Sequence, residues 1–401
     1  MSFSERGGAG IVAKTLYENA ISQGFDCNLI TVSKGDLRSA ANKHPVLFLL
    51  GLIDYFIVRT STKSILFSLY RRCSILYKSL NRKNKSTIFH LHWTPGVLST
   101  SDVKNLYISG FKIVWTFHDM WMVTGGCHHA FDCREYESDC NGCPQSRRMF
   151  HNEVMKARKE KHELFSDCQE LRVITPSRWL KDKIVQSGID ETRISVIPNP
   201  VDSKVFCPGT RATARSHFGV AVGAFVVGFV AANINDPMKN LDGVIENLCL
   251  TQETYPDLSI TLLVVGKGRV KVKVNDNSLN IVYLNEIVSI EDKVFAYRAM
   301  DVLVNYSFAE SWSLVSAEAL SCGIPVVASK IGGVVDVIKD GQNGFLLNSE
   351  AEIAPILYSL FSDSLLAQRL GDSARQTAVT EFDIEMVLQL HYELYRQMVE
   401  V

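Results

Sequence analysis

The chain has 401 residues, of which 46% are hydrophobic and 21% charged, and its formal net charge at pH 7 is −1. These values are ordinary for a globular α/β protein, and the length suits two or three domains that each bury a core. A charge so close to zero gives no basis for unspecific binding to nucleic acid, so we expect no nucleic-acid partner.

A short glycine-rich stretch precedes the first predicted helix, Ile11–Gln23. Its glycines, Gly7, Gly8 and Gly10, would let the backbone approach an anionic ligand closely, although a simple tight turn explains them equally well. The first ten residues are polar, so we expect no secretory signal. Because a doubly wound domain has a strand before this loop, we expect a stunted first strand or a native start further upstream.

The most apolar run of the chain is Val46–Val58, interrupted by Asp54. A membrane-spanning helix needs about 20 apolar residues, so this run is too short to span a bilayer. Two interpretations remain open: a helix on a membrane surface, or a buried helix followed by a solvated basic one. The basic residues that follow are Lys63, Arg71, Arg72, Lys78, Arg82, Lys83 and Lys85.

Apolar strand-like runs alternate with helical patterns along the whole chain, which favours parallel sheets built from βαβ units. The strands predicted in the first half are Cys27–Val32, Thr87–His92, Ile113–Phe117, Arg172–Thr175 and Ile194–Ile197. A Pro-Asn-Pro turn at 198–200 marks the expected linker. The strands predicted in the second half are Phe225–Ala231, Ser259–Val265, Asn280–Leu284, Val302–Tyr306 and Pro325–Ala328. Helical patterns cover Ile353–Thr380 and the C-terminal Ile384–Val401.

Three histidines lie on or just after predicted strands of the first half. His118 and Asp119 follow the strand Ile113–Phe117, so they should reach the carboxyl edge of its sheet. A histidine there is otherwise a hydrogen-bonded structural residue. His90 and His92 alternate on the preceding strand and should therefore face the same side, where one of them could support a ligand pocket.

Four of the ten cysteines are clustered: Cys127, Cys133, Cys140 and Cys143. The last two form a C-x-x-C pair, and four thiolates suit a tetrahedral structural Zn²⁺, with His128 or His129 able to replace one of them. Disulfides and loose thiols are the alternatives. The run Arg147–Lys161 that follows is rich in arginine and lysine. It predicts either a solvated basic helix or a surface for an anionic partner or a membrane.

The second half places charged residues where a parallel sheet binds anions. Lys239 opens a predicted helix and would neutralise a diphosphate, although it could also be an ordinary exposed lysine. Gly266 follows a strand and suits a turn at its carboxyl end. Glu310 and Glu318, with seven residues between them, surround a predicted helix N-terminus. Loops and helix N-termini line one edge of such a sheet, so we expect a phosphorylated ligand there.

The run from Glu310 onward resembles the signature of the retaining nucleotide-sugar glycosyltransferases of family 4. Its elements are the two glutamates, the turn and strand Cys322–Ala328, and Gly332-Gly333 with Asp336. The resemblance implies an α/β protein of the GT-B fold, in which two Rossmann-like doubly wound parallel-sheet domains face each other across a cleft. Residues 1–200 would form the acceptor-binding domain, with the C-terminal helix 384–401 packing back on it. Residues 201–383 would bind the nucleotide sugar.

The same resemblance assigns roles to individual residues. Glu310 would contact the donor sugar, Glu318 the ribose hydroxyls, and Lys239 the leaving diphosphate, while His118 would contact the donor sugar from the first domain. An arginine that the family has shortly before its lysine is missing here, so Asn233 or Arg269 would have to replace it. The remaining implied contacts to the donor come from the backbone amides of Ser311, Trp312, Ser313 and Leu314, from Gly266 beside the base, and from Gly8.

The expected activity is transfer of a sugar from a UDP- or GDP-sugar to a hydroxyl, with retention and without a catalytic metal. A subset of the family with a similar cysteine cluster acts in bacterial polysaccharide, capsule or O-antigen assembly. This implies a lipid-linked saccharide acceptor and a cytoplasmic protein, peripheral on the cytoplasmic face of the inner membrane. The alternatives are a sugar-nucleotide epimerase or hydrolase on the same fold, and a non-catalytic nucleotide-sugar-binding protein.

Overall fold

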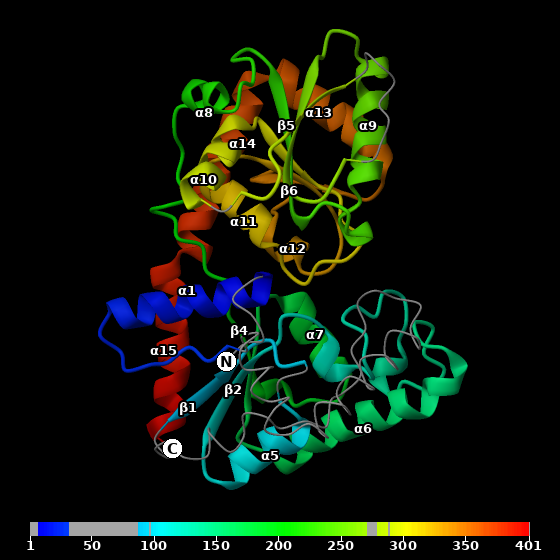
Figure 1. The fold of residues 1–401 in the computed structure, drawn as a ribbon, viewed down its shortest axis with the longest axis vertical. Helices are drawn as coiled ribbons and strands as arrows, with labels where there is room; N and C mark the ends of the chain where they lie inside the picture. Colours follow the sequence, from blue (N-terminus) through cyan, green and yellow to red (C-terminus); the bar gives the residue numbers. More distant parts are fainter. Residues whose placement is uncertain (1–6, 32–86, 96–97, 271–278, 288, 401) are drawn as a thin grey trace, which may run out of the picture. The chain divides into compact units, whose positions relative to one another are not determined.

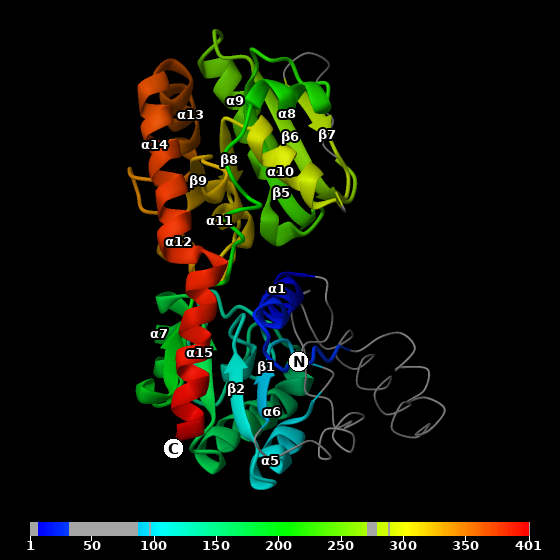
Figure 2. The same ribbon diagram turned by 90° about the vertical axis from the view of Figure 1, so that its left-hand side faces the viewer.

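The computed structural model describes residues 7–31, 87–95, 98–270, 279–287 and 289–400. The chain divides into two compact units, the first comprising Met1–Ile197 and Leu388–Val401 and the second Pro198–Val387. Each unit has a parallel sheet with helices packed against it (Figures 1 and 2).

The sheet of the first unit has the strand order β1-β2-β3-β4, and every pairing in it is parallel. Its strands are β1 (Ile88–Leu91), β2 (Lys112–Thr116), β3 (Arg172–Thr175) and β4 (Ile194–Val196). The helices in the described part of this unit include α1 (Gly8–Ser22), α5 (Thr100–Ile108), α6 (His151–Asp167) and α7 (Arg178–Gln186). Buried apolar side chains from the strands and from α5, α6 and α7 form one core. The last helix, α15 (Ile384–Glu400), contributes its residues from Leu388 onward to this unit.

The sheet of the second unit has six strands in the order β10-β9-β8-β5-β6-β7, all parallel. The strands are β5 (Phe225–Asn233), β6 (Ile260–Lys267), β7 (Asn280–Tyr283), β8 (Val302–Asn305), β9 (Val326–Ser329) and β10 (Gly344–Leu347). The helices are α8 (Arg211–His217), α9 (Leu241–Thr254), α10 (Ile290–Ala299), α11 (Leu314–Ser321), α12 (Val334–Val337), α13 (Ile353–Ser362) and α14 (Ser364–Thr377).

Helices cover both faces of this second sheet. Val226 of β5 belongs to one buried cluster, with residues of α8, α10, α11 and α14. Its neighbours in the strand, Phe225 and Val227, belong to another cluster, with residues of α9 and α13. Because successive strand residues point to opposite faces, this division places a core on each side of the sheet. It also explains why the strands read as continuous apolar runs.

The predicted strands from Thr87 onward agree with the observed ones to within one or two residues. The prediction of a strand at Cys27–Val32 is wrong for residues 27–30, which have no regular structure, whereas Thr31 forms a β-bridge and Val32 lies outside the described residues. The first helix begins three residues earlier than predicted, since Gly7 (φ 82°) serves as its N-cap and Gly8 as its first residue. The helical run predicted at Ile353–Thr380 is divided after α13, because the Asp363 side chain caps α14 by accepting from Leu366 N–H, and α14 continues into a π-helical turn at Ala378–Phe382.

Some predictions fall on residues that the structure does not describe. These are the stunted first strand, the apolar run Val46–Val58 and the basic residues between Lys63 and Lys85. Among the described residues, no helix is both long and apolar enough to cross a membrane.

Candidate functional site

The strand order of the second unit reverses between β5 and β8. From β5 the chain continues outward to β6 and β7, and it then returns to the other side of β5 with β8, β9 and β10. In open parallel sheets, ligands bind outside the carboxyl ends of the strands at such a switch point. The loops after β5 and β8 meet there, since Phe308 N–H donates to the carbonyl of Met238 at 2.8 Å.

These two loops bring Lys239 and Glu310 together. Lys239 Nζ donates to Glu310 Oε1, and the two side chains are 28% and 13% exposed. Lys239 does not open α9, as the sequence predicts, but ends a 3₁₀ turn at Pro237–Lys239. Asn240 then adopts a left-handed conformation and α9 starts at Leu241. The result is a partly buried ammonium group beside a carboxylate at the carboxyl edge of the sheet.

The backbone of Glu310 is held by the glycine loop that follows β9. Gly333 N–H donates to the Glu310 carbonyl at 3.0 Å. A Cβ on Gly332, whose φ is +52°, would lie 1.9 Å from that same oxygen. Only glycine fits such a close approach of two backbones. The sequence signature that joins the glutamates to Gly332-Gly333 therefore has a direct structural reason.

A network of small polar side chains fixes the start of α11. Asn305, at the end of β8, donates from Nδ2 to the hydroxyls of Ser313 and Ser316 at 3.0 and 3.1 Å. Ser313 is the N-cap of α11 with φ 120°, an uncommon value for a residue with a side chain. The first N–H groups of a helix have no intrahelical partner. Those of Leu314 and Val315 are therefore candidates to bind an anion at this edge.

The predicted backbone contacts from residues 311 to 314 belong to this turn. Ser311 and Ser313 are buried, and Leu314 is the first residue of α11. Trp312 is 2% exposed and its ring packs edge-to-face on Phe382, at 5.2 Å between centroids. Its side chain is thus part of the core, and only its backbone is available to a ligand.

Glu318 is buried inside the second unit and has two partners on α10. Its Oε1 lies 2.5 Å from Lys293 Nζ, and its Oε2 accepts from the Tyr297 hydroxyl at 2.6 Å. Burial and the neighbouring carboxylate raise the pKa of Tyr297 well above its ordinary value. Lys293 and Tyr297 were not predicted. Their spacing of four residues places them on one face of a helix, but no sequence pattern indicates which carboxylate they would meet.

The predicted donor residue Gly266 lies where β6 ends beside β5. Its φ is 142°, and a Cβ there would lie 1.8 Å from the carbonyl oxygen of Ala231. Tyr283 tightens this loop by donating to the Gly266 carbonyl at 3.0 Å. Asn233, at the end of β5, is exposed and accepts from Asn235 N–H, so its side chain shapes the turn. Whether Asn233 or the exposed Arg269 replaces the missing arginine stays a prediction.

In the first unit, His118 contacts His92 rather than standing alone. His118 Nε2 and His92 Nδ1 share a hydrogen bond of 3.1 Å. His90 and His92 face the same side, as predicted, with ring centroids 4.1 Å apart. His90 also hydrogen-bonds the Tyr395 hydroxyl of α15 and the Thr116 hydroxyl of β2. Burial lowers the pKa of His118 to about 4, and it lowers those of His90 and His92 well below their ordinary value.

Asp119, which follows His118, is paired within its own unit. Its Oδ2 lies 2.8 Å from His128 Nδ1, and its Oδ1 accepts from Trp121 N–H. His128 also stacks on Trp93, with centroids 4.8 Å apart. One nitrogen of His128 is therefore held by a carboxylate, an arrangement that is also common for histidines that bind a metal, so its role as a replacement ligand stays a prediction.

The clustered cysteines Cys127, Cys133, Cys140 and Cys143 are free thiols in the structure, and three of them are buried. Cys140 Sγ accepts from Gly125 N–H at 3.2 Å. Among the described residues, no group of three or more His, Cys, Asp or Glu is arranged so that it could hold a metal ion. The structural zinc predicted from the sequence therefore stays a prediction.

The basic run that follows the cysteines is solvated only in part, since Arg147, Arg148, Lys156 and Lys159 are exposed. Arg158 and Lys161 of α6 point into the protein and are only 3% and 0% exposed. Arg158 donates to the carbonyls of Tyr136 and Ser187. Lys161 donates to those of Trp121 and Thr124. These two cations hold the cysteine-containing loop on α6 and are not available to an acceptor.

Comparisons with known proteins agree with this architecture. Residues 6–205 match the family model described as Glycosyltransferase Family 4, and residues 224–363 match the model described as Glycosyl transferases group 1. A D-inositol 3-phosphate glycosyltransferase of Paenarthrobacter aurescens is 30% identical over 221 residues, which are 53% of this chain and 53% of that relative. The match thus spans about half the length of this relative.

Solved structures show the same fold at lower identity. Anabaena Alr3699/HepE in complex with UDP-glucose has a TM-score of 0.59 and 19% identity, covering 80% of this chain and 82% of that one. Sucrose-phosphate synthase of Thermosynechococcus elongatus has a TM-score of 0.65 and 18% identity, and the match covers 99% of this chain and 95% of that one. The chain therefore has the GT-B fold of glycosyltransferases. Within that class, its two domains match the models of family 4 and of group 1.

Proposed function

We propose that this protein transfers a sugar from a nucleoside-diphosphate sugar to a hydroxyl group of an acceptor. The single observation that carries the proposal is the ion pair of Lys239 and Glu310 at the switch point of the second sheet. A cation there suits a diphosphate, and a carboxylate suits the hydroxyls of a sugar. The names of the relatives support the reaction, and the UDP-glucose bound by HepE favours a UDP-sugar over a GDP-sugar.

The chemical step follows from these charges. The bond between the anomeric carbon and the diphosphate oxygen breaks, and the ammonium group of Lys239 stabilises the negative charge that develops there. N–H groups at the start of α11 bind the same diphosphate. Glu310 orients the sugar beside the carbon where positive charge develops, and Glu318 binds the ribose. We propose that the acceptor oxygen attacks from the side of departure, so that configuration is retained and the leaving phosphate takes the proton.

His118 of the first unit is proposed to contact the donor sugar as a neutral imidazole. The support for this role is the resemblance to family 4 together with the lowered pKa, which keeps the ring uncharged at neutral pH. The role of Gly8, the first residue of α1, rests on the resemblance alone.

The acceptor is proposed to be a lipid-linked saccharide in bacterial polysaccharide, capsule or O-antigen assembly. The protein would then work in the cytoplasm, peripheral on the inner membrane. Both statements rest on the resemblance to the cysteine-containing members of the family. Mass spectrometry of the lipid-linked oligosaccharide that accumulates in a deletion strain would identify the acceptor. Accumulation of no such intermediate would contradict this part of the proposal.

A structural zinc ion at the four clustered cysteines is a further part of the proposal. Four thiolates around Zn²⁺ carry a net charge of −2, and the buried Arg158 and Lys161 of α6 interact electrostatically with Cys140. Backbone N–H groups of Gln145 and Ser146 donate to Cys143, as Gly125 donates to Cys140, and such bonds suit thiolates. Elemental analysis of protein purified without chelator would test this. Well under one zinc per chain would exclude it.

The reaction class is tested by product analysis with a labelled UDP-sugar, with and without acceptor. Transfer predicts that labelled product forms only when a saccharide acceptor is present, and that UDP is released in equal amount. Free labelled sugar would indicate a hydrolase, and an epimerised nucleotide sugar would indicate an epimerase. Binding of UDP-sugar without turnover on a broad panel of acceptors would indicate a non-catalytic binding protein.

A further inference from the structure

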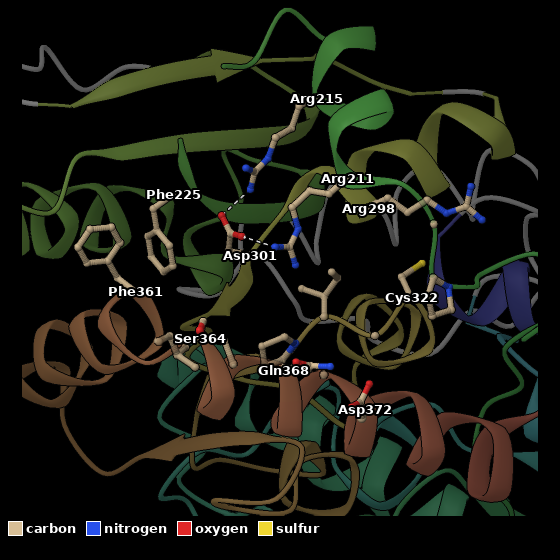
Figure 3. Close-up of a pocket in the computed structure, with 18 of the residues that line it drawn as sticks. Arg211, Arg215, Phe225, Arg298, Asp301, Cys322, Phe361, Ser364, Gln368 and Asp372 are labelled. Atoms are coloured by element: carbon tan, nitrogen blue, oxygen red, sulfur yellow. Dashed lines mark hydrogen bonds and ion pairs between the residues drawn. The ribbon is translucent and has the colours of Figure 1, made fainter. Parts of the chain in front are cut away.

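The second unit has a hollow on the edge of its sheet opposite the candidate site. Its volume is 660 Å³, within the usual range for small-molecule pockets. Phe225, Asp301 and Pro325, which line it, come at or just before the first residues of β5, β8 and β9. The hollow therefore lies at the amino ends of the strands, between α8 on one side and α13 and α14 on the other (Figure 3). Lys239 and Glu310 lie at the carboxyl ends.

The lining of this hollow has an excess of positive charge. Four arginines and two aspartates contribute to it, which leaves a formal charge of +2. Arg298 and Arg375 are bound to main-chain carbonyls, those of Cys207 and of Phe206 respectively. Carbonyl partners fix these guanidinium groups but leave their charges uncompensated.

Asp301 is engaged by three donors inside the protein. It lies 2.9 Å from Arg211 and 2.5 Å from Arg215, and it accepts from Val226 N–H at 2.6 Å. Arg215 is buried and also donates to the carbonyls of Ala299 and Val222. This arrangement makes Arg215 a structural residue and leaves Arg211 as the adaptable one.

Arg211 has the donors that an anionic ligand would need. Its side chain is 50% exposed, and within the described part of the chain its partner is a single oxygen of Asp301. A guanidinium group has five N–H donors in a planar fork that suits phosphate. Figure 3 shows Arg211 entering from α8, with Ser364 and Gln368 of α14 on the opposite side of the hollow.

One end of the hollow is aromatic. Phe225 and Phe361 pack edge-to-face with centroids 5.7 Å apart, and Phe361 is 39% exposed (Figure 3). An exposed ring beside a cationic centre suits a ligand that has both an apolar body and an anionic group.

We propose that this hollow binds a small organic phosphate, with the phosphate dianion on Arg211 and Gln368 and an apolar or aromatic body against Phe361. The dianion matches the formal charge of +2 on the lining. The site is independent of the proposed transfer reaction, because it shares no residue with the edge that carries Lys239 and Glu310.

The test uses the full chain and two probes, phenyl phosphate and inorganic phosphate, with binding measured by calorimetry. Phenyl phosphate should bind saturably and more tightly than inorganic phosphate. Arg211→Gln removes the fork, and Gln368→Glu adds a like charge opposite it, so each should weaken binding of phenyl phosphate roughly tenfold or more. Arg369→Gln is the matched control, since Arg369 is exposed on the same helix α14 but does not line the hollow. It should leave the affinity unchanged.

Lys239→Ala distinguishes binding of the probe in this hollow from binding at the proposed donor site. Binding of phenyl phosphate should persist in this variant, and its loss there would assign the probe to the other edge and overturn the proposal. Unchanged affinity in both Arg211→Gln and Gln368→Glu would also overturn it, provided that melting curves show both variants folded. Equal affinity for the two probes would overturn the proposed ligand class, because Phe361 would then contribute nothing.

Discussion

The Tyr297 hydroxyl donates a hydrogen bond of 2.6 Å to one carboxylate oxygen of Glu318 inside the second unit, and Lys293 forms an ion pair with the other oxygen. Glu310 has a comparable cationic partner in Lys239. The two glutamates of the sequence signature are thus each paired with a lysine from a different segment. Unpaired buried carboxylates would be costly, so these partners allow Glu318 to remain inside the protein next to the sheet edge.

Tyr297→Phe is expected to lower the free energy of unfolding of the second unit by about 1.5–3 kcal/mol, the usual worth of a hydrogen bond to a charged group. The ring and its packing on Phe206 remain, so the loss reports the hydroxyl alone. Urea denaturation measures it. Tyr255→Phe serves as the control, because among the described residues the Tyr255 hydroxyl has no hydrogen-bond partner and its ring only stacks on Tyr358. Equal stability of the two variants would show that the Glu318 contact contributes little.

Lys239→Ala and Glu310→Gln are each expected to lower kcat by roughly 10²–10³, as removal of a preorganised charge in a transition state does. Initial rates of UDP release with acceptor present measure this effect. Glu253→Gln is the matched control, since Glu253 is exposed near the end of α9 in the same unit, away from the carboxyl ends of the strands. Near-wild-type kcat in both site variants would contradict the proposed roles.

Strands that are long apolar runs could be predicted from the sequence, because both faces of the second sheet are buried. The short strand β10 was not predicted from the sequence. It follows a turn-forming Asp-Gly-Gln-Asn-Gly stretch, and as an edge strand of the described sheet it pairs with β9 alone. The positions of Glu310 and Glu318 were predictable from their spacing. Their lysine partners were not, because pairing across 71 and 25 residues depends on tertiary structure that no local pattern encodes.

The histidine cluster of the first unit predicts how its stability depends on pH. An unfolded histidine titrates near 6.5, whereas burial lowers the pKa of His118 to about 4. Between these values the unfolded chain binds more protons than the folded one, so stability is full above pH 6.5 and falls as the pH drops toward 4. From pH 6.5 to pH 5 the loss for one such group is about 1.5 kcal/mol.

Tryptophan fluorescence during urea denaturation measures this effect, since four of the five tryptophans, at 93, 115, 121 and 179, belong to the first unit. His118→Gln should make the unfolding midpoint less sensitive to pH in this range. The exposed His217 of the second unit provides the control substitution, His217→Gln, which should leave the pH dependence of the first unit unchanged. An identical pH dependence in the two variants would show that His118 is not the titrating group.

Gly332→Ala is expected to reduce activity through the position of Glu310. The new Cβ would meet the Glu310 carbonyl oxygen at 1.9 Å, so one of the two loops must move. Gly341→Ala is the matched control, because Gly341 also has a positive φ, +70°, but nothing lies within 4 Å of its Cβ position. Both variants share the backbone cost of about 1 kcal/mol for a side chain at positive φ. Only Gly332→Ala displaces the carboxylate, so its kcat should fall at least about tenfold below that of Gly341→Ala. If both variants kept the same kcat, the contact between Gly332 and Glu310 would not position the catalytic carboxylate, and the glycine loop would serve stability alone.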